Sequence, residues 1–144
     1  MDLSILGRFE NQTNTYIPFF LSSVKAGFPS PADDFIERRL DLNEYLIKHP
    51  EATFFVRVSG DSMIGAGIFP EDILVVDRSL NAKDNSVIIA ALDGELTVKR
   101  LKYQGSKTYL YPENINYKPI QITKDSSFFV WGVVTNVIHK LTNY

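Results

Sequence analysis

The strongest constraint on the fold of this chain is a series of short β-type segments that begins at residue 53. The segments are rich in valine, isoleucine, phenylalanine and tyrosine, and they cover residues 53–59, 73–78, 86–92, 95–103, 107–111 and 128–139. Asp93-Gly94 separates two of them and is a strong signal for a two-residue hairpin turn, and Gly105-Ser106 indicates another turn. The sequence therefore predicts a mainly β domain with a compact, curled or barrel-like antiparallel sheet.

The first part of the chain has a different character. No helical or strand period persists over residues 1–31, and several prolines interrupt the segment. We expect residues 1–31 to form an extended N-terminal arm and residues 32–144 to form the β-rich domain. An ordinary N-terminal edge strand followed by a loop fits the same pattern.

A short helical segment is expected where the arm meets the domain. Ser-Pro at 30–31, followed by acidic residues, is typical of a helix start. The apolar spacing over residues 35–40 predicts one short amphipathic helix. Asp41 or Asn43 is suited to cap a second helical turn, which Pro50 ends.

The composition excludes several classes of function. The chain has no cysteine, so disulfides, thiolate nucleophiles and cysteine-ligated metals are impossible, and His49 and His139 alone do not suggest a metal or cofactor site. A net charge of −2 with dispersed Lys and Arg argues against direct electrostatic binding to nucleic acid. No apolar run approaches the ~18 residues of a membrane span, and no secretory signal is apparent. We expect a soluble, cytoplasmic protein.

The first candidate for chemistry is Ser62. It lies in Ser-Gly-Asp-Ser-Met at 59–63, directly after the first β segment, where Gly60 permits a sharp turn. A serine at the lip of a sheet can act as a nucleophile, with the backbone N–H groups of Ser62 and Met63 receiving a developing oxyanion. Gly-Asp-Ser is also ordinary turn chemistry, and Asp61 is better explained as a turn residue than as a third catalytic group.

The second candidate is Lys99, which interrupts the apolar alternation of residues 95–101. A serine hydroxyl needs a base, and lysine serves as that base in an established variant of the serine mechanism. The amine must be neutral, and burial in an apolar site lowers a lysine pKa by disfavouring the charged form. The hairpin through Asp93-Gly94 would set Lys99 beside the very apolar segment 86–92. A solvated lysine on the outer face of the strand is the alternative, and the sequence does not show that Ser62 and Lys99 touch.

Several short stretches along the chain carry a recognisable pattern. They are Phe-Pro-Ser-Pro-Ala at 28–32, Ser-Gly-Asp-Ser-Met at 59–63, Asp-Gly-Glu at 93–95, Thr-Val-Lys-Arg-Leu at 97–101 and Gly-Val-Val at 132–134. Together they resemble the UmuD family of SOS mutagenesis proteins, which are self-cleaving Ser–Lys peptidases related to the LexA repressor. The stretches that contain Ser62 and Lys99 are the most specific part of this resemblance.

The resemblance implies a set of roles and partners. Ser62 matches the nucleophile, Lys99 the general base, and Ala26-Gly27 the bond that the protein cuts in its own arm. A RecA filament on single-stranded DNA is expected to stimulate cleavage, and the shortened homodimer is expected to join a UmuC-type translesion polymerase. Residues 17–20 resemble the segment tied to the sliding clamp, although four apolar residues also suit simple packing of the arm.

Three other functions fit the sequence less well. LexA-like repressors carry a helix-turn-helix domain, for which the residues before Ala26 are too few, so direct operator binding is not expected. Type I signal peptidases share the Ser–Lys chemistry but need a membrane anchor. A non-enzymatic polymerase-interaction subunit on the same fold is the main alternative, and the joint presence of Ser62, Lys99 and Ala26-Gly27 argues against it.

Overall fold

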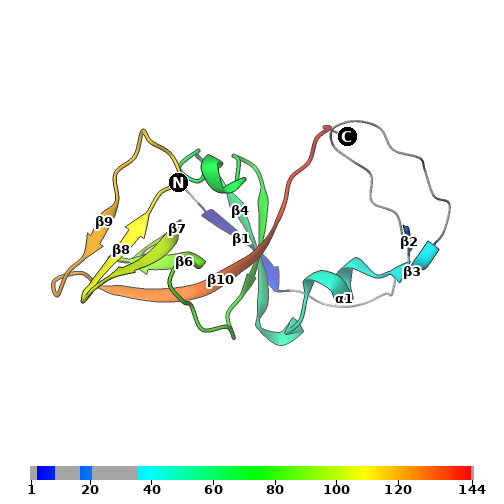
Figure 1. The fold of residues 1–144 in the computed structure, drawn as a ribbon, viewed down its shortest axis with the longest axis horizontal. Coiled ribbons are helices and arrows are strands. Elements are labelled where there is room, and N and C mark those ends of the chain that lie inside the picture. The colour runs from blue at the N-terminus through cyan, green and yellow to red at the C-terminus, as the bar shows by residue number, and fades with distance from the viewer. Residues whose placement is uncertain (1–2, 9–16, 21–35, 144) are drawn as a thin grey trace. The chain divides into compact units, whose positions relative to one another are not determined.

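The structure is a computed structural model and describes residues 3–8, 17–20 and 36–143 (Figure 1). The chain divides into two compact units, a larger one of residues 1–9 and 49–144 and a smaller one of residues 10–48. The expected cleavage pair, Ala26-Gly27, lies outside the described residues. The division of the chain at residue 31 stays a prediction.

The larger unit is an eight-stranded sheet with the strand order β1-β4-β5-β10-β6-β7-β8-β9. Every neighbouring pair in it is antiparallel. The strands are β1 (Leu3–Arg8), β4 (Thr53–Val58), β5 (Ile73–Asp77), β6 (Val87–Leu92), β7 (Glu95–Gln104), β8 (Lys107–Tyr111), β9 (Ile120–Ile122) and β10 (Phe128–Ile138). Two short 3-10 helices are present: η1 (Pro50–Ala52) directly precedes β4, and η2 (Ile64–Ala66) lies between β4 and β5. The predicted fold class, a mainly β chain with a curled antiparallel sheet, is confirmed.

Both predicted hairpin turns are present. Leu92 pairs with Glu95 across a two-residue loop in which Asp93 and Gly94 have φ angles of 49° and 84°. Positive φ at both central positions is what a type I′ turn requires, which explains why an Asp-Gly pair occupies it. The β7–β8 turn likewise has a positive φ of 64° at Gly105. The first of these turns sets the register of β7 against β6 and therefore decides which residue lies opposite Lys99.

The long strand β10 joins the two halves of the curled sheet (Figure 1). Its first part pairs with β6 and its second part with β5, and the register shifts once in each pairing, between Val130 and Gly132 and between Val134 and Asn136. Such bulges bend a strand and increase its twist. At the first bend, a Cβ on Gly132 of β10 would lie 2.5 Å from Val76 Cγ1 of β5. These two strands therefore approach too closely there for a larger residue.

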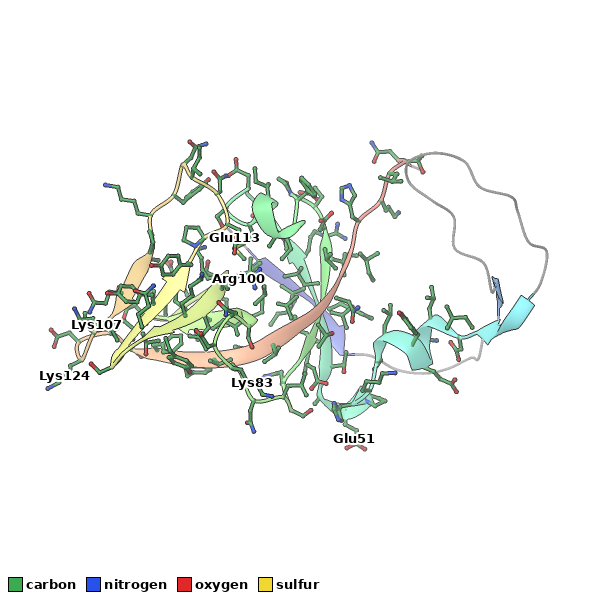
Figure 2. The ribbon with its side chains drawn as sticks, viewed as in Figure 1. Glu51, Lys83, Arg100, Lys107, Glu113 and Lys124 are labelled. Carbon is green, nitrogen blue, oxygen red and sulfur yellow. The ribbon has the colours of Figure 1, made fainter. Side chains whose placement is uncertain are left out.

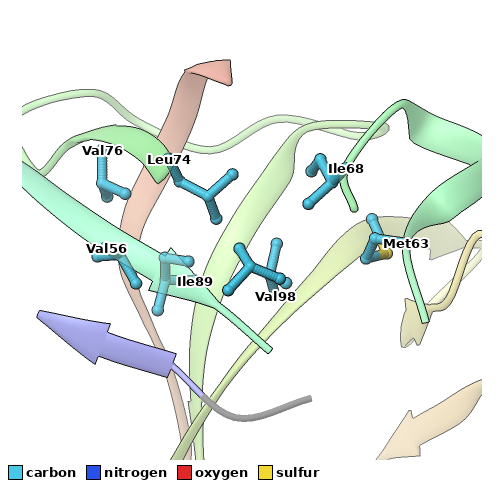
Figure 3. Close-up of a cluster of buried hydrophobic side chains, with 8 residues drawn as sticks. Val56, Met63, Ile68, Leu74, Val76, Ile89 and Val98 are labelled. Carbon is cyan, nitrogen blue, oxygen red and sulfur yellow. The ribbon is translucent and has the colours of Figure 1, made fainter. Parts of the chain in front are cut away.

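Charged side chains lie mainly on the outside of the larger unit. Glu51, Lys83, Lys107 and Lys124 are exposed, as Figure 2 shows. The core forms two clusters. One consists of Val56, Val58, Met63, Ile68, Leu74, Val76, Ile89 and Val98 (Figure 3), and the other of Ile88, Ala90, Leu101 and Leu110.

Met63 is important for the site because it anchors the segment that follows β4. Its side chain is completely buried in the first cluster, although its backbone belongs to a loop. Burial of a methionine side chain contributes about 1.5–3 kcal/mol, which favours one fixed position for the adjacent Ser62.

The smaller unit contains strands β2 (Ile17–Phe20) and β3 (Ile36–Leu40) and helix α1 (Leu42–Leu46). The amphipathic helix predicted over residues 35–40 is wrong, because residues 36–40 pair with β2 as an antiparallel strand. The second helical turn is confirmed as α1, and the Asp41 side chain caps it by accepting a 3.0 Å hydrogen bond from Asn43 N. A backbone partner distant in sequence thus overrode the local helical pattern of residues 35–40.

Candidate active site

Ser62 lies in the turn between β4 and η2. β4 ends at Val58, and Gly60 reverses the chain direction with a φ of 84°, a conformation that glycine adopts without strain. Met63 then enters the core, and Ser62 is held against the protein with only 1% of its surface exposed. The side chain is therefore buried within the turn, whereas a solvated serine hydroxyl would be exposed.

Lys99 reaches Ser62 from the middle of β7. It pairs with the fully buried Ile88 of β6, and only 7% of its surface is exposed. Its Nζ donates to Ser62 Oγ at 3.2 Å, to Thr97 Oγ1 at 2.9 Å and to Val98 O at 3.1 Å. The alternative of a solvated lysine on an outer face is therefore wrong.

Burial lowers the pKa of Lys99 below its ordinary value. A buried ammonium loses hydration, and within the described ranges no carboxylate lies within ion-pair distance to compensate. The neutral amine has two N–H donors and one lone pair. If Thr97 Oγ1 and Val98 O take the two donors, the lone pair is left to accept the proton of Ser62.

A cleft of about 600 Å³ opens beside Lys99. Its lining mixes apolar and polar side chains in similar measure, and Glu95 and Lys118 carry opposite charges. The lining residues are Leu3, Leu92, Glu95, Leu96, Thr97, Lys99, Tyr117, Lys118 and Ile120. A space of this size accommodates several side chains of an extended peptide, and Lys99 forms part of its wall.

The loop between β8 and β9 borders this cleft and holds the nucleophile turn. Tyr117 donates its hydroxyl to Asp61 Oδ1 at 2.5 Å, and Asn114 Nδ2 donates to Asp61 O at 2.9 Å. The hydrogen bond to Asp61 raises the pKa of Tyr117. The carboxylate of Asp61 thus binds the loop, consistent with its interpretation as a turn residue.

The structure brings some of the predicted residues together. Ser62 and Lys99 form one hydrogen-bonded pair, and Met63 follows in the same turn, whereas Ala26-Gly27 is outside the described residues. The oxyanion role of the Ser62 and Met63 N–H groups stays a prediction. Sequence reasoning did not assign a role to Thr97, although it lies two residues before Lys99 and so on the same face of the strand.

The two histidines lie away from this pair and contact buried carboxylates. His49 Nδ1 is 2.6 Å from Asp77 Oδ2, and His139 Nδ1 is 2.5 Å from Asp72 Oδ1. Among the described residues, no three His, Cys, Asp or Glu side chains are grouped as a metal site would need. None of the helices in the described part of the chain is long and apolar enough to cross a membrane.

Comparison with known proteins gives a consistent result. The Peptidase S24-like family matches residues 18–135. Protein MucA of Escherichia coli is 46% identical over 121 residues, which cover 83% of this chain and 82% of MucA. Protein ImpA of Shigella flexneri is 43% identical over 134 residues, covering 85% and 83% of the two chains. Protein SamA of Salmonella typhimurium is 44% identical over 123 residues, covering 85% of each.

Proposed function

Because the chain belongs to the Peptidase S24-like family, we propose that Ser62 and Lys99 are its catalytic dyad and that they cut the chain's own Ala26-Gly27 bond. The chain is an autocatalytic serine peptidase of the UmuD/LexA type and a homologue of the SOS mutagenesis proteins MucA, ImpA and SamA. The observation that carries the residue assignment is the 3.2 Å contact between Lys99 Nζ and Ser62 Oγ in a buried setting.

Acylation begins when neutral Lys99 takes the proton of Ser62 Oγ while that oxygen attacks the carbonyl carbon of Ala26. The N–H groups of Ser62 and Met63 stabilise the resulting oxyanion. The tetrahedral intermediate then collapses, and the Lys99 ammonium donates its proton to the departing nitrogen of Gly27. The first product is an ester between Ala26 and Ser62, together with a free amino group on Gly27.

Deacylation repeats the same steps with water. Lys99, neutral again, takes a proton from a water molecule that attacks the ester carbonyl, and it returns that proton to Ser62 Oγ as the ester breaks. The net reaction is hydrolysis of one peptide bond, and the enzyme residues return to their starting state. The products are residues 1–26 and residues 27–144.

The burial of Lys99 favours this chemistry, because it lowers the pKa of the amine and so increases its neutral fraction. Each unit by which the pKa falls raises the neutral fraction about tenfold and corresponds to about 1.4 kcal/mol between the two protonation states. Thr97 Oγ1 and Val98 O also fix the direction of the amine, so the lone pair faces Ser62. Small residues on both sides of the scissile bond suit a nucleophile that is only 1% exposed.

The proposal extends to the partners of the protein. The arm of residues 1–31 carries the cleavage site and includes strands β1 and β2. Residues 32–144 form the peptidase domain, to whose sheet β1 adds an edge strand. A RecA filament on single-stranded DNA stimulates cleavage by favouring the conformer in which the arm occupies the cleft. The homodimer of residues 27–144 then serves as the accessory subunit of a UmuC-type polymerase in the cytoplasm, and residues 17–20 contact the sliding clamp before they are removed.

Cleavage in the presence of the proposed activator tests this function. Full-length protein is incubated with RecA filaments on single-stranded DNA, and the fragments are identified by mass. The Ser62→Ala variant is the matched control, because it removes one oxygen atom and leaves the turn intact. A fragment that begins at Gly27 in the wild type alone supports the proposal. A cut at another bond, or an equal cut in Ser62→Ala, would contradict it.

A further inference from the structure

The loop between β8 and β9 is bonded to the backbone of the nucleophile itself. Glu113 N donates to Ser62 O at 2.8 Å, and Gly65 N donates to Glu113 O at 2.8 Å. The two bonds run in opposite directions between the same two segments. They therefore form a bridge that fixes the backbone of the Ser62 turn against Glu113 from both sides.

This bridge is unusually close at Gly65. A Cβ added there would lie 2.7 Å from Glu113 O, a distance that real Cβ atoms essentially never show. Glycine at this position lets the two backbones approach. The position of Ser62 therefore depends on where Glu113 is held.

The side chain of Glu113 is held by the residue that follows the general base. Its Oε1 accepts a 2.6 Å hydrogen bond from Arg100 Nε, and the two side chains lie close together in Figure 2. Arg100 is itself oriented by a second bond, from NH1 to Asn85 O at 2.6 Å. The pair is partly buried, with side-chain exposures of 25% for Arg100 and 32% for Glu113, so water screens it less than a surface pair.

Glu113 thus connects the two halves of the dyad. Its backbone is bonded to Ser62, and its side chain is bonded to Arg100, which is adjacent to Lys99 on β7. The direct contacts described between Ser62 and Lys99 include one hydrogen bond of 3.2 Å. This distance is at the long end of the range over which a general base takes a proton. A small displacement of Ser62 would exceed that range.

We infer that Glu113 is a positioning residue that keeps Ser62 Oγ within reach of Lys99 Nζ, an inference that rests on the proposed function. Glu113 touches no reacting atom and acts only through the backbone bridge and Arg100. A misplacement of about 1 Å at a catalytic group costs on the order of 100-fold in rate. Loss of one partly exposed charge pair that supports the turn is accordingly expected to cost roughly three- to tenfold.

The test uses the full-length chain and the rate of self-cleavage across a range of alkaline pH. Glu113→Gln keeps the shape of the side chain and the backbone bridge but removes the charge, and Arg100→Gln removes the other partner. Glu71→Gln is the matched control, because Glu71 also pairs with an arginine, Arg57, at 3.7 Å but its side chain is 76% exposed. Melting temperatures of all variants are measured in the Ser62→Ala background.

Positioning predicts a specific pattern in these rates. Glu113→Gln and Arg100→Gln each lower the plateau rate at high pH, by up to roughly three- to tenfold. The double variant is no slower than the worse single variant, because both changes weaken the same connection. The pH midpoint of the profile stays unchanged, since it reports the ionisation of Lys99. Glu71→Gln cleaves like the wild type. If Glu113 had a purely structural role, its replacement would lower the melting temperature. The plateau rate, measured well below that melting temperature, would then equal the wild-type rate.

The outcomes separate this inference from the proposed function. A Glu113→Gln variant with the wild-type plateau rate, or losses that multiply in the double variant, would overturn the positioning role alone. A shift in the pH midpoint of the cleavage rate would overturn the positioning role and indicate that Glu113 acts on the ionisation of Lys99. A wild-type chain that does not cut itself would overturn the proposed function and this inference together. If Glu113→Gln does not fold, the plateau rate of Arg100→Gln decides the question in the same way.

Discussion

Replacement of Gly65 by alanine tests whether the position of the nucleophile turn controls the reaction. The new Cβ would lie 2.7 Å from Glu113 O, about 0.7 Å short of the 3.4 Å at which ordinary contact begins. Part of that displacement would pass to Ser62, since the turn and Glu113 are joined by hydrogen bonds on both sides of the contact. The Ser62–Lys99 distance of 3.2 Å has no room to lengthen without loss of the hydrogen bond.

The expected cost follows from these distances. A displacement of several tenths of an ångström at a catalytic oxygen lowers the rate by roughly tenfold or more. The steric conflict also lowers the free energy of unfolding by about 1–3 kcal/mol. The assay is the first-order rate of self-cleavage at alkaline pH, measured by intact mass well below the melting temperature of the variant.

Gly132→Ala is the matched control for this experiment. Its Cβ would lie 2.5 Å from Val76 Cγ1, so it creates a comparable conflict between β10 and β5, two strands that carry neither Ser62 nor Lys99. We expect a similar loss of stability and a wild-type rate of cleavage. A Gly65→Ala chain that cleaves at the wild-type rate would show that the position of the turn does not control the reaction. A Gly132→Ala chain that slows equally would show the same.

Three further predictions concern ionisation. The rate of self-cleavage should rise about tenfold per pH unit below the lowered pKa of Lys99 and level off above it, because only the neutral amine is active; a stopped assay over a pH series checks this slope. The pKa of Lys99 is lower in the folded state than its ordinary value of 10.5, so the folded state binds fewer protons between these two pKa values. Over that pH interval the Ser62→Ala chain should therefore gain stability with rising pH relative to Ser62→Ala/Lys99→Met, which urea unfolding would measure. Burial alone raises the pKa of Asp77, but hydrogen bonds from Ser79 and His49 outweigh it and leave the pKa below 3.8. Asp77→Asn should therefore be less stable than its parent at neutral pH, and the difference should shrink as pH falls below about 3.8, as acid unfolding curves would show.

Local signals explain the parts of the fold that the sequence predicts. The β-branched segments became strands with bounds close to those expected, and Asp93-Gly94 adopted the positive φ angles that favour this pair in a hairpin. The short helix α1 follows from the capping side chain of Asp41. Each of these features depends on residues within a few positions of one another.

The features that the sequence did not predict depend on distant partners. Residues 36–40 have a helical pattern but pair with β2, whose Pro18 also obscured it as a strand. Strand β9 contains only 3 residues, too few for a periodic signal.

The candidate site also depends on contacts between residues that are distant in the sequence. The alternation around Lys99 identifies the two faces of β7 but not which of them is buried, and the Ser62–Lys99 contact spans 37 positions in the sequence. The pair is therefore predicted by the resemblance to a known family and not by the local pattern of residues. The contribution of Glu113 had no sequence signal, because its backbone atoms make the contact with Ser62.

The most direct test of the whole account is the intact mass of three purified proteins held at alkaline pH with no other protein added. They are the wild type, Ser62→Ala and Lys99→Ala. We expect that the wild type alone is converted into a species that begins at Gly27, at a rate that does not depend on any added metal or cofactor. Continued full-length mass in all three, or the same new species in Lys99→Ala, would contradict the claim that a buried neutral lysine activates Ser62.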